Sequence, residues 1–376
     1  MNVAQESKIP LAQPIIDSEM RQAALHAMLN ERLVLGESVY KFEEEFAEYC
    51  GTRTAISVNS GTAALALALI SLGVQSGEVL TTPLSFVATA NAVLHAGATP
   101  RFADVNSQSY CLDPERVEQA ISAKTKAVIP VHLYGYPSDM DRLCEISNER
   151  NVVVVEDACQ AHGALYHGRR VGSMGVASCF SFYPSKNMTV GGDGGMVTTN
   201  DDSLGEKIRS LRDSGRIKGE KYVHGVIGFT ARLNNIQAAI GRVQLRRLDK
   251  WNERRREIAQ SYTKRLEGTG DLVLPPRGAD GTTPVYHLYV IRSKSRDNIR
   301  DWLGKKGIET GIHYPVPIHL QPAYQALYNY RKGTFPVSEK LSEEVLSIPM
   351  YPALTDEELT RVIDAIREFF ANGGKQ

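Results

Sequence analysis

The sequence predicts an α/β protein with a mostly parallel central sheet covered by helices on both faces, followed by a smaller α+β domain. Three observations lead to this prediction. Between residues 53 and 155, short apolar strands alternate with amphipathic helical stretches, as in repeated βαβ units. The run of four valines at 152–155 is apolar on both faces, as expected of a central parallel strand. The length of 376 residues indicates two domains, because a domain contains roughly 150 residues.

The first half of the chain supplies the large sheet. A helix is predicted over 17–35, Gly36 ends it, and Ser38 is expected to cap the helix that follows. The alternating region and its continuation then contain strands at 54–58, 79–82, 99–103, 127–131, 152–155, 179–182 and 195–199, and helices at 61–72, 85–96, 114–122, 139–150 and 202–213.

A long helix predicted over 234–267 leads into the second domain, where the chain becomes richer in proline and glycine after Leu274. We place the large domain at 1–250 and the small domain at 251–376, and leave open whether the N-terminal helix packs on the small domain. The small domain is predicted to contain strands at 285–292 and 308–313, and helices at 295–306, 338–346 and 355–370.

The composition argues against several classes of partner. Lys plus Arg equals Asp plus Glu at 43 each, so no overall charge attracts nucleic acid or an anionic membrane. No stretch of about 18 apolar residues occurs, and the N-terminus does not resemble a signal peptide. The five cysteines form no CxxC pair, which indicates neither a disulfide framework nor a metal site. These features together indicate a cytoplasmic protein.

The first candidate motif is Asn59-Ser60-Gly61-Thr62, which follows a predicted strand and opens a helix. Free backbone N–H groups and the helix dipole favour an anion at such a position, and Thr62 adds a hydroxyl donor. The motif is therefore a candidate phosphate site, although an ordinary helix-capping turn has the same composition.

The second motif is Glu156-Asp157, at the end of the valine-rich strand. Ligands bind at the carboxyl edge of open α/β sheets, and successive side chains of a strand point to opposite faces, so only one carboxylate is expected to face the ligand. A pyridinium nitrogen would give Asp157 a charge-assisted hydrogen bond. A helix cap or a metal ligand is the alternative reading.

The third motif places Lys186 in a turn after a strand, beside the glycine-rich segment 191–195. A lysine that forms an imine must lose its proton easily, and a partly desolvated pocket lowers its pKa. A solvated surface cation is the ordinary alternative for a single lysine. Together, however, the three motifs supply a phosphate cradle, a partner for a pyridine nitrogen and a Schiff-base lysine, which indicates pyridoxal 5'-phosphate (PLP).

With these motifs, the sequence resembles the DegT/DnrJ/EryC1/StrS family of sugar aminotransferases, which have the aspartate-aminotransferase fold (PLP fold type I). The resemblance implies that Lys186 and Asp157 are catalytic, with Lys186 carrying protons and Asp157 keeping the pyridine nitrogen protonated. The similar stretches, in order along nearly the whole chain, are 36–51, 60–69, 156–164, 180–187, 191–195, 228–245 and 313–324.

The resemblance also implies cofactor contacts and an assembly. Gly61, Thr62, Ala63 and Ser181 would hold the phosphate, Phe86 would stack on the ring, and Gln160 would bind the ring hydroxyl. Arg232 would reach the phosphate from a second subunit, which implies a homodimer with shared active sites. Many members have Asn two residues before this arginine, where this chain has Thr230. The contact across the interface would then be made by Arg232 itself.

For the substrate, the resemblance implies a nucleotide-linked keto sugar, aminated by ping-pong transfer from glutamate. Members that act at a C4 ketone often have His where this chain has Tyr183, so C3 is favoured. Tyr183, Tyr314 and His319 are the candidate sugar contacts, with a structural role in a proline-rich loop as the alternative for the last two. A keto-cyclitol aminotransferase and a non-catalytic PLP-binding regulator remain open. A PLP dehydratase is disfavoured, because such members replace the Schiff-base lysine with histidine.

Overall fold

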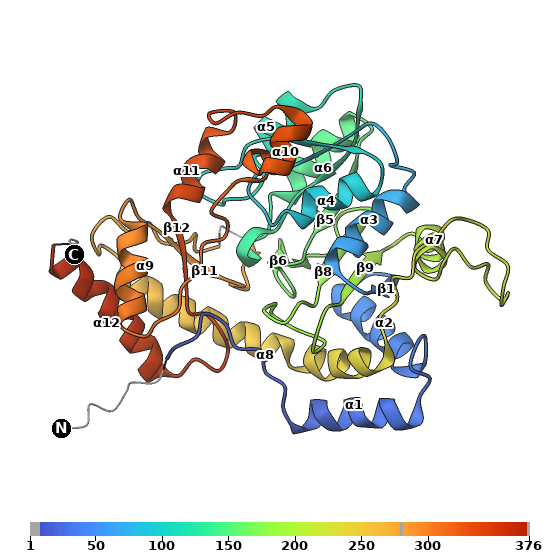
Figure 1. The fold of residues 1–376 in the computed structure, drawn as a ribbon, viewed down its shortest axis with the longest axis horizontal. Helices are drawn as coiled ribbons and strands as arrows, with labels where there is room; N and C mark the ends of the chain where they lie inside the picture. Colours follow the sequence, from blue (N-terminus) through green and yellow to red (C-terminus); the bar gives the residue numbers. More distant parts are fainter. Residues whose placement is uncertain (1–7, 279–280, 374–376) are drawn as a thin grey trace.

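The computed structural model describes residues 8–278 and 281–373 and shows a seven-stranded sheet in the order β1-β9-β8-β5-β4-β2-β3 (Figure 1). The pairs along β3, β2, β4, β5 and β8 are all parallel, whereas β9 runs antiparallel to both β8 and β1. The mostly parallel sheet is therefore confirmed. The strands are β1 Thr54–Val58, β2 Glu78–Thr81, β3 Thr99–Phe102, β4 Thr125–Ile129, β5 Val153–Asp157, β8 Ala177–Ser181 and β9 Gly195–Thr199.

Helices cover both faces of this sheet, as predicted. Alternate residues of each strand enter different cores: Ile56 packs with one helix layer, and Ala55 with the other. On the second face, the Phe180 ring meets Phe46 of α2, with centroids 5.0 Å apart. The first layer contains α3 (Gly61–Ser71), α4 (Ala88–His95) and α7 (Asp202–Arg212), and the second contains α2 (Glu37–Cys50), α5 (Pro114–Ala120), α6 (Met140–Glu149) and the first half of α8 (Asn235–Leu266).

A second core forms around the other half of α8, where a two-stranded antiparallel sheet packs against helices (Figure 1). Ile9 joins this core, because the chain before α1 pairs with Ile308. Helix α1 lies along α8, to which Arg246 ties it through Glu19. The division at residue 250 stays a prediction. The elements of this core besides α8 are β11 Tyr289–Arg292, α9 Arg296–Lys305, β12 Val345–Ile348 and α12 Asp356–Ala371, and α1 spans Ser18–Asn30. Helices α10 (Pro322–Tyr328) and α11 (Pro336–Glu344) contribute Tyr324 and Leu341 to two other clusters of buried residues.

The predicted cap at Ser38 is wrong. Helix α2 begins at Glu37, and Gly36 occupies the capping position without a side-chain hydrogen bond. Ser38 is instead buried inside the first turn, where its hydroxyl donates to Glu31 Oε1 at 2.7 Å. The preceding helix ends at Asn30, five residues before the predicted end, so that Glu31 can reach back to α2.

The predicted strand at 308–313 is also wrong. Ile308 pairs with Ile9 and Gly311 pairs with Ser347, but these isolated bridges involve two different neighbours, so no continuous ladder forms. The partner of β11 is instead β12, in a segment predicted as the end of a helix. Its three apolar residues, Val345, Leu346 and Ile348, are buried together with Ser347 along β11. The sequence reading also missed the short strands β6 (Leu165–Tyr166), β7 (Arg169–Arg170) and β10 (Thr282–Thr283).

In residues 8–278 and 281–373, no helix is both long and apolar enough to cross a membrane. Within the same ranges, no group of three or more His, Cys, Asp or Glu side chains is arranged to hold a metal ion.

Candidate active site

A cavity of about 450 Å³ lies at the carboxyl ends of β5 and β8 and brings together residues of all three sequence motifs. Residues from the second core close it on the other side. Parallel strands place their carboxyl ends at one edge of a sheet, which is where α/β proteins bind ligands. The residues that line the cavity include Leu11, Ala12, Gly61, Thr62, Ser85, Phe86, Thr89, Asp157, Cys159, Gln160, Ser181, Tyr183, Lys186, His287, Leu288, His313 and Tyr314.

The N-terminus of α3 forms one wall of the cavity. A β-carbon at Gly61 would lie 2.8 Å from both Cys159 Sγ and Ser181 Cβ, so only glycine fits this approach. Gly61 and Thr62 line the cavity, as predicted for a phosphate site. Ala63 does not: its N–H donates to Ser60 Oγ at 3.1 Å, which gives this amide a different partner from the predicted phosphate.

Strand β5 separates the two carboxylates of the second motif, as the period of a strand requires. Asp157 lines the cavity, whereas Glu156 points to the opposite face and is fully buried. Asp157 Oδ2 accepts a hydrogen bond from Thr89 Oγ1 at 2.8 Å, and Oδ1 accepts one from the Cys159 N–H at 3.2 Å. The carboxylate facing the cavity is thus fixed through both oxygens.

Glu156 organises the loop beside the site rather than the site itself. Its Oε1 accepts from the N–H groups of Met174 and Gly175 at 2.8 and 2.7 Å, and from Ser178 Oγ at 2.6 Å. Its Oε2 accepts from the Gly172 N–H at 3.0 Å and from His132 Nε2 at 3.1 Å. Burial alone would raise the pKa of Glu156, but these donors, His132 foremost, outweigh it and lower the pKa to about 2.

We expect Glu156→Gln to destabilise the fold by roughly 3–5 kcal/mol at neutral pH, because an amide presents two donors to a shell built only of donors. Since folding lowers the pKa of Glu156, its stabilisation is present above the pKa of the unfolded chain and is lost as the pH falls toward 2. Urea unfolding at several pH values measures both effects. Glu44→Gln, at an exposed position of α2, is the control, and equal stability of the two variants would contradict the prediction.

Lys186 projects from the turn after β8 into the cavity. Its backbone N–H donates to the Tyr183 carbonyl at 2.9 Å, which closes the turn. Burial lowers the pKa of Lys186, and the nearby Cys159 and Asp157 oppose this shift only partly. A lysine that loses its proton more readily has the properties required of an imine-forming amine.

Gln160 and Tyr314 meet at the boundary between the two cores. Gln160 Oε1 accepts a hydrogen bond from the Tyr134 N–H at 2.9 Å. Its Nε2 donates to the Tyr314 hydroxyl at 3.4 Å. The Tyr134 hydroxyl in turn donates to the His313 carbonyl. The ring of Tyr314 lies 5.9 Å from that of Phe86, which is 55% exposed and faces the same cavity.

Besides Ala63, two further predicted site residues lie outside this cavity. His319 is fully buried among aromatic rings, with Nε2 3.0 Å from Glu339 Oε1, so it cannot touch a substrate in this arrangement. The structure therefore corrects the predicted contact with His319. Arg232 pairs with Asp213 at 2.7 Å and does not line the cavity of its own chain.

The sequence reading missed several lining residues that come from distant segments. Leu11 and Ala12 belong to the irregular segment before α1, and Thr89 belongs to the first turn of α4. His287 and His313 come from the second core, where burial is the main cause that lowers the pKa of each ring, to about 4 for His313. Both imidazoles are therefore neutral at neutral pH. Among these positions, only Thr89 offered a signal in the sequence, because its hydroxyl lies three residues after Phe86, the predicted ring-stacking residue.

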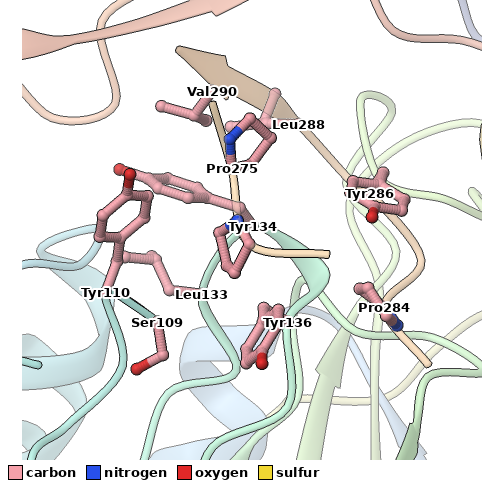
Figure 2. A pocket seen from close by; sticks show the side chains of 11 residues that line it. Ser109, Tyr110, Leu133, Tyr134, Tyr136, Pro275, Pro284, Tyr286, Leu288 and Val290 are labelled. Atoms are coloured by element: carbon pink, nitrogen blue, oxygen red, sulfur yellow. The ribbon is translucent and has the colours of Figure 1, made fainter. Parts of the chain in front are cut away.

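A second cavity lies next to the first but is much smaller (Figure 2). It has a volume of about 20 Å³, which is enough for roughly one water molecule. Figure 2 shows the rings of Tyr110, Tyr134 and Tyr136 around it, with Leu288 opposite. Leu288 lines both cavities, so the aromatic cluster around the small cavity forms the wall behind the candidate site. The small cavity itself has too little volume to be that site.

A family model described as the DegT/DnrJ/EryC1/StrS aminotransferase family matches residues 14–367. The chain belongs to this family. The dTDP-3-amino-3,4,6-trideoxy-alpha-D-glucose transaminase of Streptomyces venezuelae is 44% identical over 349 residues, which cover 92% of this chain and 91% of that protein. A protein of Geobacillus stearothermophilus named a pleiotropic regulatory protein is 43% identical over 354 residues, 94% of each chain.

Solved structures agree with this assignment. The crystal structure of S. venezuelae DesV in complex with a ketimine intermediate superposes with a TM-score of 0.92 at 41% identity, covering 96% of this chain and 98% of that one. The predicted PLP fold type I is thereby confirmed, and the chain is a PLP-dependent aminotransferase.

The cavity fits the PLP that this family uses. Gly61 leaves a cradle that a side chain would fill, the end of β8 supplies the hydroxyl of Ser181, and Asp157 presents a fixed carboxylate. Lys186 supplies an amine whose pKa burial lowers. Lys186, Asp157, Gly61, Thr62 and Ser181 are the residues that would hold the cofactor.

Proposed function

We propose that the chain transfers an amino group from glutamate to the C3 ketone of a nucleotide-linked sugar by ping-pong transamination. The observation that carries the proposal is the cavity in which Lys186, with a lowered pKa, and the fixed carboxylate of Asp157 face the same space. The similarity to a dTDP-3-amino-sugar transaminase supports the substrate class and the C3 position. Tyr183, 54% exposed at the cavity, is free to contact the sugar.

When bound, PLP supplies an aromatic ring that withdraws electrons from the carbon bearing the amino group. Lys186 faces the cavity and has a pKa that burial lowers, so it would carry the proton between that carbon and the aldehyde carbon of the cofactor. Asp157 would hold the proton on the ring nitrogen by accepting its hydrogen bond. Phe86 and Tyr314 line the site with aromatic surface.

The test has two stages. Glutamate is added to the cofactor-loaded protein while the visible absorbance is followed and 2-oxoglutarate is measured. We expect the cofactor band to disappear in proportion to the 2-oxoglutarate released. The aminated protein is then exposed to C3-keto and C4-keto nucleotide sugars, and recovery of the band with the C3 ketone alone supports the proposal. Recovery only with a C4 ketone or a keto-cyclitol would reassign the acceptor.

A regulatory role is the second candidate, because a relative of 43% identity carries the name of a regulatory protein. A protein that only senses PLP would bind the cofactor but would leave glutamate and glutamine unchanged. The same absorbance experiment separates the two functions, since only the aminotransferase releases a keto acid.

We further propose a homodimer in which each active site uses both chains. Apolar side chains of the segment 217–229 are exposed in the single chain, with Ile227 at 96% and Tyr222 at 79%. Exposed apolar surface of this kind marks an interaction site. Arg232 lies three residues after this segment and does not line the cavity of its own chain, which suits a contact across an interface.

Mixing two inactive variants tests the shared site. We expect Lys186→Ala and Arg232→Ala subunits, unfolded and refolded together, to regain activity, because one site of each hybrid dimer then has both side chains intact. Turnover of the mixture is compared with each variant refolded alone, and sedimentation gives the mass. A mixture no more active than its components, at the mass of a dimer, would show that Arg232 serves its own chain or neither.

A further inference from the structure

Two hydroxyl groups connect α4 and the preceding loop to the carboxylate at the end of β5. Thr89 Oγ1 lies 2.8 Å from Asp157 Oδ2, and Ser85 Oγ lies 2.9 Å from Thr89 Oγ1. Thr89 is 2% exposed, and Ser85 and Asp157 are 4% exposed, yet all three line the cavity. They are therefore shielded from bulk water and reach only the space in which the cofactor would bind.

The chemistry of the groups fixes the direction of these hydrogen bonds. An ionised carboxylate can only accept, so the hydroxyl of Thr89 must donate its single hydrogen to Asp157. The oxygen of Thr89 then accepts from Ser85, which is the remaining donor of the pair. The relay runs from Ser85 through Thr89 to Asp157.

The relay also fixes the orientation of the carboxylate. Oδ2 is held by Thr89 of α4, and Oδ1 is held by the Cys159 N–H, which follows β5. Rotation of the carboxylate would break both hydrogen bonds, so its plane is set by two separate elements. Each oxygen keeps a further lone pair to accept a hydrogen bond from the cavity.

The surroundings make such donors important. The titratable groups whose charge acts with that of Asp157 are Lys186, Cys159, Cys179 and Tyr314, and of these only Lys186 carries a positive charge. A buried carboxylate is costly unless hydrogen bonds compensate for the lost water. Donors to the ionised form favour that form, and hydrogen bonds to charged groups are stronger than those between neutral groups.

The segment that supplies these hydroxyls also supplies Phe86, the predicted ring-stacking residue, between Ser85 and Thr89. We propose that Thr89, supported by Ser85, is a positioning residue that holds the carboxylate of Asp157 oriented toward the nitrogen of the cofactor ring. The inference rests on the proposed role of Asp157. One short segment would thus position both Phe86, against the face of the cofactor ring, and Asp157, at the ring nitrogen.

Thr89→Val and Thr89→Ser test this role, because valine keeps the shape and loses the hydroxyl, whereas serine keeps the hydroxyl. The Kd of the apoenzyme for PLP is measured by fluorescence titration, together with the absorbance of bound PLP, kcat and KM. We expect Thr89→Val to raise the Kd about tenfold, to shift the absorbance and to lower kcat more than it changes KM. Thr89→Ser should stay within about threefold of the wild type, and Ser85→Ala should act in the same direction as valine but less strongly.

The controls separate positioning from folding. Thr263→Val removes a buried hydroxyl in the second core, so it reports the loss of Tm without an effect on PLP. In an Asp157→Asn background, Thr89→Val should change the Kd by less than about twofold, because residues that act through one another are not additive. A wild-type Kd and absorbance for Thr89→Val, or an equal effect in the Asp157→Asn background, would overturn the inference. If Asp157→Asn itself binds PLP and turns over normally, the proposed role of Asp157 fails as well.

Discussion

Replacing Lys186 with alanine is expected to abolish transamination, lowering kcat by at least about 10⁴-fold. Two functions are lost together, the covalent attachment of the cofactor and the proton transfer at the substrate carbon, and proton transfer alone accounts for roughly 10²- to 10⁴-fold. No other lysine of the described residues lines the cavity, so none can take over the role of Lys186. The variant should also lose the absorbance band that reports covalently held PLP.

Single-turnover measurement with glutamate gives the rate of the donor half-reaction directly, apart from product release. Lys186→Arg keeps a positive charge but does not deprotonate, so it should be as inactive as the alanine variant. Lys250→Ala, at an exposed position on α8, is the matched control and should behave like the wild type. A small primary amine added to Lys186→Ala should restore part of the rate if the fold is intact. Turnover near the wild-type level in Lys186→Ala would refute the central role of this residue.

Asp157→Asn is expected to lower kcat about 10²- to 10³-fold, which is the usual cost of removing one preorganised electrostatic group from an active site. Asparagine keeps nearly the same shape, and its single oxygen can still accept from the Cys159 N–H, while the Thr89 hydroxyl can turn to accept from the amide nitrogen. It carries no charge, however, to hold the proton on the ring nitrogen. The fold should therefore persist while the chemistry slows.

The neighbouring carboxylate provides the contrast. Glu156→Gln should lower stability, whereas Asp157→Asn should lower kcat and weaken PLP binding with little change in Tm, because Glu156 faces five donors and Asp157 faces the cavity. Both variants are measured by thermal unfolding and by single-turnover kinetics. A large loss of Tm without loss of kcat in Asp157→Asn would assign Asp157 a structural role.

Much of the fold and the centre of the site could be predicted from local patterns. The alternation of strands and helices indicated a mostly parallel sheet, and such a sheet gathers the ends of β5 and β8 at one edge. The period of a strand distinguished Asp157 from Glu156. The run of valines before Asp157 and the glycine-rich turn after Lys186 are both local features of the sequence.

The errors occurred where a residue had two plausible local roles. Ser38 is a residue type that often caps helices, but its hydroxyl donates to Glu31 and Gly36 occupies the capping position. His319 lies in a loop typical of substrate contacts, but packing against Phe335 and Glu339 buries it completely. The segment Val345–Ile348 became a strand because β11 lies beside it.

The sequence alone determined the α/β architecture and the identity of the groups at the centre of the site, Lys186 and Asp157, because both depend on periodicity and on residues close in the chain. Only the tertiary structure decided what surrounds them. Thr89 is 68 positions from Asp157, and Tyr134 is 179 positions from His313. Contacts over such separations depend on how helices pack on the sheet and how the second core closes on the first, which no local pattern encodes.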